Sequence, residues 1–384
     1  MSDAGHSRHA PESIGIGMLG YAFMGKAHSN AFRKIAYMTW PPPLAPRLVA
    51  IAGRDEEAVS EAAARYGYER ATTDWRDLVS DPEIGLFDNG GPNHLHAEPT
   101  IAAAEAGKHV VCEKPLGRSA DESFEIWRRV EATGVKHMCA FNYRFVPAVR
   151  LAREMLEAGE LGEIRHFRVR YLQDWGDDPS LDTWRFHPDE AGSGALGDLG
   201  THAIDLAHFL VGDIARVSGL VRTFLPGRQV DDAIEAAVEF ESGTVGTLEA
   251  TRLALGRRNA LQWEINGQKA SLAFDMERMN ELQVFRADGD RARGFKTVLV
   301  SEADHPFWQH WWPPGHIIGW GDTFVHELHH FLAAVAGTGD VAPYGATFED
   351  GYRADEVGQA ILRSSETGSR ESIRYRTLPS GGGR

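Results

Sequence analysis

Short apolar segments alternate with helical patterns along the first third of the chain, and this alternation restricts the fold more than any other feature. The expected strands are residues 14–19, 48–52, 86–89, 109–112 and 136–141. The expected helices are residues 25–34, 56–66, 75–79, 100–106 and 120–132. Strands that alternate with helices in this way pair in parallel through right-handed crossovers. The sequence therefore predicts an N-terminal α/β domain built on a parallel sheet.

The pattern changes after Phe141, where strands begin to follow one another with hairpin-like breaks. A helix is expected over 148–158, followed by strands over 164–171, 217–224, 233–240, 244–251, 261–265, 271–274 and 282–285. Helices over 323–336 and 348–364 are expected to close the fold. A chain of 384 residues exceeds what one core usually accommodates. We expect one α/β domain over 1–142, a second with a mostly antiparallel sheet over 143–378, and a flexible Gly-rich tail over 379–384.

Charge and composition exclude several classes of protein. The formal net charge of −15 argues against a nucleic-acid or anionic membrane surface. No uncharged apolar run approaches the roughly 18 residues typical of a membrane span, and residues 1–11 lack the apolar core of a signal peptide. Cys112 and Cys139 both lie in apolar strand-like segments, which is typical of buried thiols. We expect a cytoplasmic protein with reduced cysteines.

A glycine-rich loop follows the first expected strand. Gly15, Gly17 and Gly20 match G-x-G-x-x-G, but the first two lie inside the strand, where no phosphate loop forms. The strand–helix junction carries Gly20-x-Ala22-x-x-Gly25 instead. In such a loop the first glycine makes the tight turn, the last allows close packing, and the helix N-terminus faces a pyrophosphate. This junction predicts a Rossmann dinucleotide-binding domain, with Ala22 crowding the middle position.

The end of the second expected strand bears on the choice between NAD and NADP. An acidic residue there would hold the ribose diol of NAD, but Gly53 occupies that position. Arg54 could pair with the 2′-phosphate of NADP, and Asp55 could still reach a diol or cap the next helix. The residues slightly favour NADP and leave NAD open.

Lys114, Asp198 and His202 form the expected catalytic group. Lys114 follows an apolar strand and precedes Pro115, which favours an extended strand end. Asp198 and His202 are spaced i, i+4, so a helix would place them on one face. Oxidation of an alcohol needs a base and a cation near its oxygen. His202 is the natural base near neutral pH, although the sequence leaves the choice between His202 and Lys114 open.

Aromatic and polar residues elsewhere are candidates for binding a sugar. Residues 305–320 carry several tryptophans, of which Trp312 is a candidate for stacking on a pyranose ring. A hydrophobic plug between the domains is the alternative interpretation of this segment. The polar candidates for sugar hydroxyls are Tyr143, Arg144, Gln173 and Asp174.

One metal-binding pattern is interpreted as coincidental. His326-Glu327-Leu328-His329-His330 matches H-E-x-x-H, which places two zinc ligands on one helical face in metalloproteases. No recognised third ligand follows, and Phe324, Leu328 and Phe331 give the same helix an apolar core face. We expect no metal site.

Taken in order, the motifs resemble the Gfo/Idh/MocA oxidoreductases over nearly the whole chain. The matching segments are residues 20–28, Pro92-Asn93-His94-Leu95-His96, Glu113-Lys114-Pro115 and Asp198 with His202. The resemblance implies a Rossmann domain joined to an α/β domain whose large open sheet often forms the oligomer interface. It also implies cofactor contacts from Phe23, Met24, Asn93, His96, Glu113, Lys114, Asn142, Trp184 and Arg185. Gly90-Gly91 departs from the pattern, since a threonine is usual before Pro92.

The resemblance and the catalytic residues together predict an NAD(P)-dependent dehydrogenase. Its expected substrate is a secondary ring hydroxyl of a sugar, anhydrosugar or glycoside, and its expected assembly is a homodimer or homotetramer. Two alternatives use the same fold. An NAD-dependent glycosidase would show no net cofactor reduction, and a nucleotide-sensing regulator would tolerate loss of Lys114, Asp198 or His202.

Overall fold

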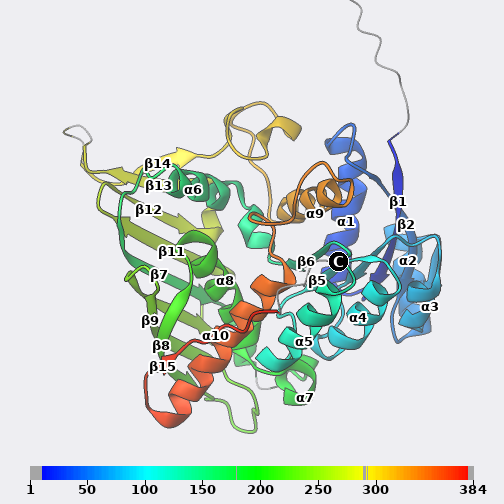
Figure 1. The fold of residues 1–384 in the computed structure, drawn as a ribbon, viewed down its shortest axis with the longest axis horizontal. Helices are drawn as coiled ribbons and strands as arrows, with labels where there is room; N and C mark the ends of the chain where they lie inside the picture. Colours follow the sequence, from blue (N-terminus) through cyan, green and yellow to red (C-terminus); the bar gives the residue numbers. More distant parts are fainter. Residues whose placement is uncertain (1–10, 179, 289–290, 292, 379–384) are drawn as a thin grey trace, which may run out of the picture.

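Two β-sheets, each covered by helices, make up the protein in the computed structural model, which describes residues 11–178, 180–288, 291 and 293–378 (Figure 1). The smaller sheet lies in the N-terminal part of the chain and the larger sheet in the C-terminal part. This arrangement confirms the expected fold class. The expected tail over 379–384 lies outside the described residues. No helix in the described part of the chain is long and apolar enough to cross a membrane.

The first sheet has six parallel strands in the order β3-β2-β1-β4-β5-β6. Its strands are β1 (Ser13–Leu19), β2 (Ala45–Ala52), β3 (Arg70–Thr72), β4 (Leu86–Asn89), β5 (His109–Glu113) and β6 (His137–Ala140). Its helices are α1 (Phe23–Met38), α2 (Glu56–Tyr66), α3 (Trp75–Ser80), α4 (Ala97–Glu105) and α5 (Ala120–Glu131). Strand β3 was not expected, because this short edge strand exposes two of its three residues and lacks an apolar run.

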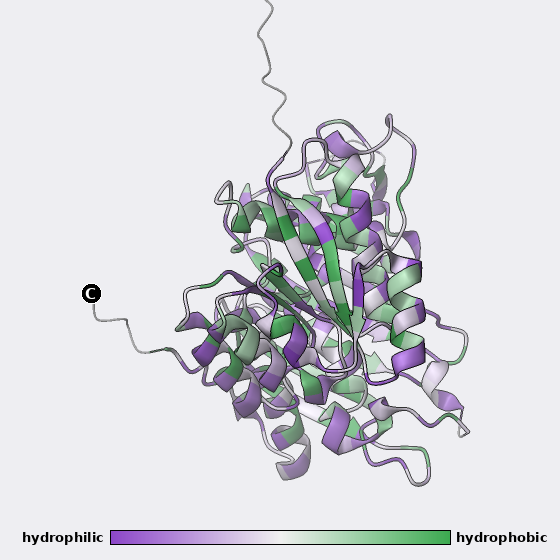
Figure 2. Ribbon diagram, turned by 90° about the vertical axis from the view of Figure 1, so that its right-hand side faces the viewer, coloured by the Kyte–Doolittle hydropathy of each residue, from purple (hydrophilic) through white to green (hydrophobic). Residues whose placement is uncertain are grey.

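Most residues of the strands in this sheet are apolar and buried, because helices cover both faces of the sheet. The ribbon of these strands is green along much of its length in Figure 2. Gly15 and Gly17 belong to this packing. A Cβ at Gly15 would lie 1.8 Å from the backbone oxygen of Glu83, and one at Gly17 would lie 2.8 Å from Ile84. These two glycines therefore serve strand packing, as their position within the strand predicts.

The second sheet is mixed and has nine strands in the order β14-β13-β12-β11-β7-β10-β9-β8-β15. The strands are β7 (Ile164–Leu172), β8 (Ile214–Arg222), β9 (Ala233–Phe240), β10 (Val245–Thr251), β11 (Ala260–Gly267), β12 (Ala270–Asp275), β13 (Glu281–Arg286), β14 (Lys296–Leu299) and β15 (Glu371–Ser372). Within this sheet, β7 and β10 are the only pair of described strands that runs in parallel. The sequence missed β14 and β15, which are short and largely exposed.

Helices cover one face of the second sheet and leave the other open. Helices α6 (Pro147–Glu157), α8 (Thr201–Leu210) and α10 (Phe348–Thr367) lie on the side that faces the first domain (Figure 1). A capping box formed by Thr347 and Asp350 begins α10. The open face carries charged side chains such as Arg168 and Arg170, which pair across strands with Glu264 and Gln262.

Helix α9 (Asp322–Val335) is late in the sequence but packs against the first domain, beside α1 (Figure 1). Phe324, Leu328 and Phe331 belong to the same buried cluster as Ile16 and Phe32. Helix α9 lies inside the range expected for the second domain, yet its side chains complete the core of the first. The expected boundary near residue 142 stays a prediction.

Candidate active site

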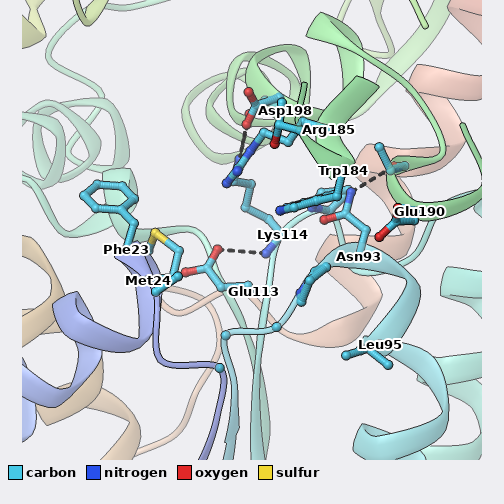
Figure 3. Close-up of a pocket in the computed structure, with 18 of the residues that line it drawn as sticks. Phe23, Met24, Asn93, Leu95, Glu113, Lys114, Trp184, Arg185, Glu190 and Asp198 are labelled. Atoms are coloured by element: carbon cyan, nitrogen blue, oxygen red, sulfur yellow. Dashed lines mark hydrogen bonds and ion pairs between the residues drawn. The ribbon is translucent and has the colours of Figure 1, made fainter. Parts of the chain in front are cut away.

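A cavity of about 1170 Å³ lies between the two sheets, beyond the C-terminal ends of β1, β4 and β5. Ligands of doubly wound sheets bind at this edge. Of the expected cofactor and substrate residues, the cavity is lined by Gly20, Ala22, Phe23, Met24, Arg54, Asn93, Glu113, Lys114, Asn142, Tyr143, Gln173, Trp184, Arg185, Asp198 and His202. Figure 3 shows Phe23 and Met24 on one side of Glu113, with Trp184, Arg185 and Asp198 toward the other.

The glycine-rich loop has the geometry that a phosphate group needs. Gly20 has φ +99, and a Cβ there would lie 2.6 Å from the carbonyl oxygen of Gly90. A Cβ at Gly25 would lie 2.0 Å from the carbonyl oxygen of Gly20. Ala22 is the N-cap of α1, and neither a side-chain cap nor an acidic residue in the first turn occupies the helix start. The first backbone N–H groups of α1 are therefore available to an anion.

Arg54 and Asp55, which follow β2, have different surroundings in the structure. Asp55 accepts a hydrogen bond of 2.8 Å from the backbone N–H of Ala58 and thereby caps α2. Arg54 lines the cavity and is exposed. A Cβ at residue 53 would lie 2.2 Å from the ring of Tyr21, so a larger side chain there would displace that ring. Of Arg54 and Asp55, the first is in the cavity lining and the second is not.

Lys114 and Asp198 form an ion pair inside the cavity. The ammonium Nζ of Lys114 donates to the backbone oxygen of Asp198 at 2.6 Å and to its Oδ1 at 3.3 Å. Burial alone would raise the pKa of Asp198, but the nearby cations Lys114, Arg185 and Arg252 lower this pKa to about 2. Asp198 is therefore a carboxylate at any ordinary pH.

The helix expected to carry Asp198 and His202 is not uniform. Asp198 lies in a π-helical turn (Leu196–Gly200), and His202 lies in the first turn of α8. Single π turns in α-helices are frequent at functional sites. Both side chains still reach the cavity, so the expectation that they act together is compatible with the wider turn.

His202 is enclosed by aromatic rings. Its ring centroid lies 4.5 Å from that of Tyr143, 5.8 Å from that of Phe141 and 5.9 Å from that of Tyr171. Its Nδ1 has no hydrogen-bond partner in the described part of the chain. Burial, and then the charge of Lys114, lower the pKa of His202 well below its usual value, with Asp198 opposing them. The imidazole is therefore neutral near pH 7 and is able to accept a proton.

A chain of hydrogen bonds forms one polar wall of the cavity. Trp175 Nε1 donates to Gln173 Oε1 at 2.7 Å, and Gln173 Nε2 donates to Asn259 Oδ1 at 2.9 Å. Tyr171 also donates to Asn259 Oδ1, at 2.6 Å, so the hydroxyl of Tyr143, 2.7 Å from that of Tyr171, is the donor of that pair. The Tyr143 oxygen is left as an acceptor for a ligand hydroxyl. The sequence missed Asn259 and Tyr171, because single polar residues in strands and turns carry no motif.

Arg144 and Asp174 do not line the cavity. Arg144 is buried and donates through Nε to both carboxylate oxygens of Asp205 at 3.0 Å, and through Nη2 to Asp350 at 3.1 Å. Asp174 accepts from the backbone N–H of Gly256 at 3.2 Å and from Arg258 at 3.1 Å. The expectation that these two residues face a sugar is therefore corrected, because protein partners already satisfy both charges.

Trp312 and His96 are also outside the cavity lining. Trp312 is 50% exposed. Both ring nitrogens of His96 lie near backbone carbonyl oxygens, 2.8 Å from that of Pro115 and 3.1 Å from that of Gly91, so His96 joins two cavity loops from behind. Of the tryptophans in 305–320, Trp320 lines the cavity and stacks on Phe23 with centroids 5.3 Å apart.

The histidines of the H-E-x-x-H pattern have partners within the protein. His326 accepts a hydrogen bond of 2.6 Å from Trp311 and lies 2.9 Å from the backbone oxygen of Phe145. His330 lies 2.8 Å from the backbone oxygen of Val341. Among the described residues, no group of three or more His, Cys, Asp or Glu side chains could hold a metal ion.

Two protein-family models match the chain, one over each of the two sheets. The family described as "Oxidoreductase family, NAD-binding Rossmann fold" matches residues 14–141, and the "GFO/IDH/MocA C-terminal domain" matches residues 149–273. Levoglucosan dehydrogenase from Pseudarthrobacter phenanthrenivorans is 43% identical over 380 residues, which cover 92% of this chain and 96% of that protein.

Solved structures of similar proteins also match nearly the whole chain. A levoglucosan dehydrogenase in complex with NADH and levoglucosan is similar, with a TM-score of 0.91 and 44% identity, covering 94% of this chain and 100% of that one. An oxidoreductase domain protein from Kribbella flavida has a TM-score of 0.91 and 42% identity, with coverage of 94% and 100%.

Proposed function

This chain belongs to the Gfo/Idh/MocA oxidoreductase family, and we propose that it is an NAD-dependent dehydrogenase that oxidises a secondary ring hydroxyl of an anhydrosugar such as levoglucosan. The observation that carries the proposal is the meeting of Lys114, Asp198 and a neutral His202 at the inner end of a cavity whose outer end is the glycine-rich loop.

The residues around the loop fit a dinucleotide. Two glycines whose Cβ positions are blocked, together with an uncapped helix N-terminus, suit a pyrophosphate. Phe23, Met24, Asn93, Glu113 and Asn142 would surround the nicotinamide end. When bound, NAD would supply the hydride acceptor for the oxidation.

The reacting hydroxyl would lie between Lys114 and His202. The ammonium of Lys114, which pairs with Asp198, would donate a hydrogen bond to the substrate oxygen and stabilise the negative charge that develops there. His202 would accept the proton, because its imidazole is neutral near pH 7. Asp198 would orient a second hydroxyl and stabilise the charged imidazole after transfer.

Two features support an anhydrosugar or a related pyranose as the substrate. Trp175 and Trp184 line the cavity beside the hydrogen-bonded wall of Gln173, Asn259 and Tyr143, which combines stacking surfaces with hydroxyl partners. The levoglucosan dehydrogenase named above binds levoglucosan in its crystal structure.

NAD is the proposed cofactor because that levoglucosan dehydrogenase structure holds NADH. Arg54 is the feature that would favour NADP, since it lines the cavity at the end of β2. We therefore assign the choice between the two cofactors to Arg54, and the affinities of Arg54→Ala for NAD and for NADP would test this assignment.

We also propose a cytoplasmic homodimer or homotetramer. The open face of the second sheet carries exposed apolar side chains, Leu220 and Val245, which a second copy would cover. Both cysteines are unpaired and buried, as expected in a reducing compartment. Sedimentation analysis of the wild type and of Leu220→Glu would test the assembly, because the charged variant should shift the protein toward the monomer.

The deciding experiment is an absorbance assay for reduced nicotinamide, with NAD and with NADP, over levoglucosan, glucose, xylose, myo-inositol and methyl glucosides. We expect reduction of NAD with levoglucosan and a product lighter by two hydrogen atoms. Cleavage of a glycoside without net reduction would favour the glycosidase alternative. Tight NADH binding without turnover of any sugar would favour a regulator.

A further inference from the structure

His28 lies on α1, directly behind the wall of the cavity, and its side chain is completely buried. Its Nδ1 lies 2.9 Å from Oδ2 and 3.0 Å from Oδ1 of Asp88, and its Nε2 lies 3.0 Å from Oε1 of Glu113. A neutral imidazole has only one N–H, so it cannot donate to two carboxylates at once, whereas an imidazolium can. The geometry therefore requires a positively charged His28 if both neighbours are ionised.

The groups around His28 come from several elements. Asp88 lies one residue before the end of β4, Glu113 ends β5, and Glu327 faces the cluster from α9. Neither carboxyl oxygen of Glu327 has a hydrogen-bond partner among the described residues, and burial raises its pKa well above the usual value, so it is a neutral acid. Tyr68 and Cys112 also lie near Asp88, and burial raises the pKa of each, so both stay neutral. Asp88 and Glu113 are thus the anions that His28 balances.

Burial opposes a charge on His28, but the two carboxylates outweigh it. Asp88 and then Glu113 hold the pKa of His28 well above its usual value. Burial raises the pKa of Asp88, and His28 lowers it. The charge of each member therefore depends on the others.

Glu113 connects this cluster to the catalytic group. Its Oε1 faces His28. Its Oε2 accepts a hydrogen bond of 3.1 Å from the backbone N–H of Lys114 (Figure 3). Both oxygens are thereby held, and the carboxylate has one orientation at the cavity wall, next to Met24 (Figure 3). The same hydrogen bond fixes the backbone from which the ammonium of Lys114 projects.

We propose that His28 is a positioning residue of the dehydrogenase. Its imidazolium holds the Glu113 carboxylate in one orientation at the cofactor side of the cavity and, through the Lys114 amide, holds the ammonium at the reacting oxygen. The inference rests on the proposed function, because it assigns Glu113 and Lys114 to the same active site. His28 itself touches neither substrate nor cofactor.

Replacement of His28 would leave Asp88 and Glu113 as two buried carboxylates without a counterion. Two carboxylates that share a buried site without a counterion repel each other, so we expect one of the two to take up a proton. In His28→Gln the protonation of the Asp88–Glu113 pair as a whole then depends on pH. Adding Asp88→Asn leaves one buried carboxylate in place of two and so removes the repulsion that favours this proton.

The experiment compares wild type, His28→Gln, His28→Gln/Asp88→Asn and Tyr68→Phe. Tyr68→Phe is the control, because it deletes a buried hydroxyl that hydrogen-bonds to Ser29 next to His28, at 3.0 Å, without removing a charge from the cluster. The readouts are kcat and KM against pH, NADH affinity against pH by fluorescence, and nitrogen NMR of protein labelled with ¹⁵N-histidine.

We expect His28→Gln to lower kcat roughly 10- to 100-fold at pH 6, the size of effect that misplacement of a reacting group causes. The loss should shrink as pH rises, because the Asp88–Glu113 pair then loses the proton that it holds in place of the imidazolium, and NADH affinity should follow the same ionisation. The double variant should move that ionisation to lower pH. Wild type should show one histidine protonated on both nitrogens even at pH 9, and this signal should be missing in His28→Gln.

Parallel pH profiles for His28→Gln and wild type, with a uniform loss like that of Tyr68→Phe, would reduce His28 to a packing role. The absence of a doubly protonated histidine in wild type at pH 8 would also overturn the inference, even if His28→Gln fails to fold. If no sugar is oxidised, the proposed function fails by itself, while the NMR spectrum and the pH dependence of NADH binding still decide the role of His28.

Discussion

Lys114→Met is the substitution that bears most directly on the proposed chemistry. The Lys114 side chain is only 15% exposed, and its ammonium donates to two oxygens of Asp198. Methionine keeps most of the stem volume and removes the charge, so packing around the strand end should persist. The change therefore isolates the electrostatic contribution of the ammonium.

The size of the effect follows from what the ammonium does. A positioned group that stabilises charge or moves a proton contributes about 10²- to 10⁴-fold to turnover, or roughly 3–5.5 kcal/mol of barrier. The charge of Lys114 also lowers the pKa of His202, second only to burial. Removing it should raise that pKa, and because the neutral imidazole is the active form, the acid limb of the rate profile should move to higher pH.

The assay is single-turnover reduction of NAD with levoglucosan over a range of pH, with NADH affinity measured by fluorescence. We expect kcat to fall at least about 10²-fold while NADH affinity changes little. A deuterium at the reacting carbon should slow the variant, which would show that the chemical step limits turnover. A rate within a few-fold of wild type, or an acid limb that stays in place, would refute the assignment of Lys114.

Three further predictions concern the cofactor and the buried charges. Arg54→Ala should weaken NADP binding by about 1.5–3 kcal/mol and leave NAD within twofold, as judged by calorimetric titration; equal losses would make Arg54 structural. Arg144→Met should lower the free energy of unfolding in urea by about 3–5 kcal/mol, because it leaves Asp205 buried without its partner, and should leave KM unchanged; a large rise in KM would return Arg144 to the substrate site. Glu327→Gln should stabilise the protein relative to wild type, and the difference should grow by at most about 1.4 kcal/mol per pH unit above about pH 4.5. The reason is that burial raises the pKa of Glu327 in the folded protein, so wild type loses stability as the glutamate ionises in the unfolded chain. Parallel curves of stability against pH for the two proteins would contradict this.

The sequence predicted the fold class and most of the elements because their signals are local. Helix α2 and strand β9 coincide with the expected ranges, since each has a clear period and a clear end. The structure supports the placement of the phosphate loop at Gly20 rather than at Gly15, because Gly15 and Gly17 are needed for packing inside β1. The family resemblance that the motifs indicated is confirmed by matches over both domains.

The misplacement of Arg144 and Asp174 has one physical cause. Arg144 and Asp174 are polar residues near the site in sequence, but their partners, such as Asp205 and Arg258, become neighbours only in the folded chain. Sequence alone could not show that these charges are already satisfied. Asn259 was missed for the same reason, because only folding brings it to the cavity from the turn before β11.

The position of α9 has a consequence for how the protein is made. Residues 322–335 leave the ribosome long after the first domain has been synthesised, so that domain emerges with the surface that receives Phe324, Leu328 and Phe331 still uncovered. Until then the nascent chain presents an apolar face that a chaperone or another chain is able to bind. A fragment that ends at residue 142 should therefore aggregate, and supplying α9 as a separate peptide should improve its solubility.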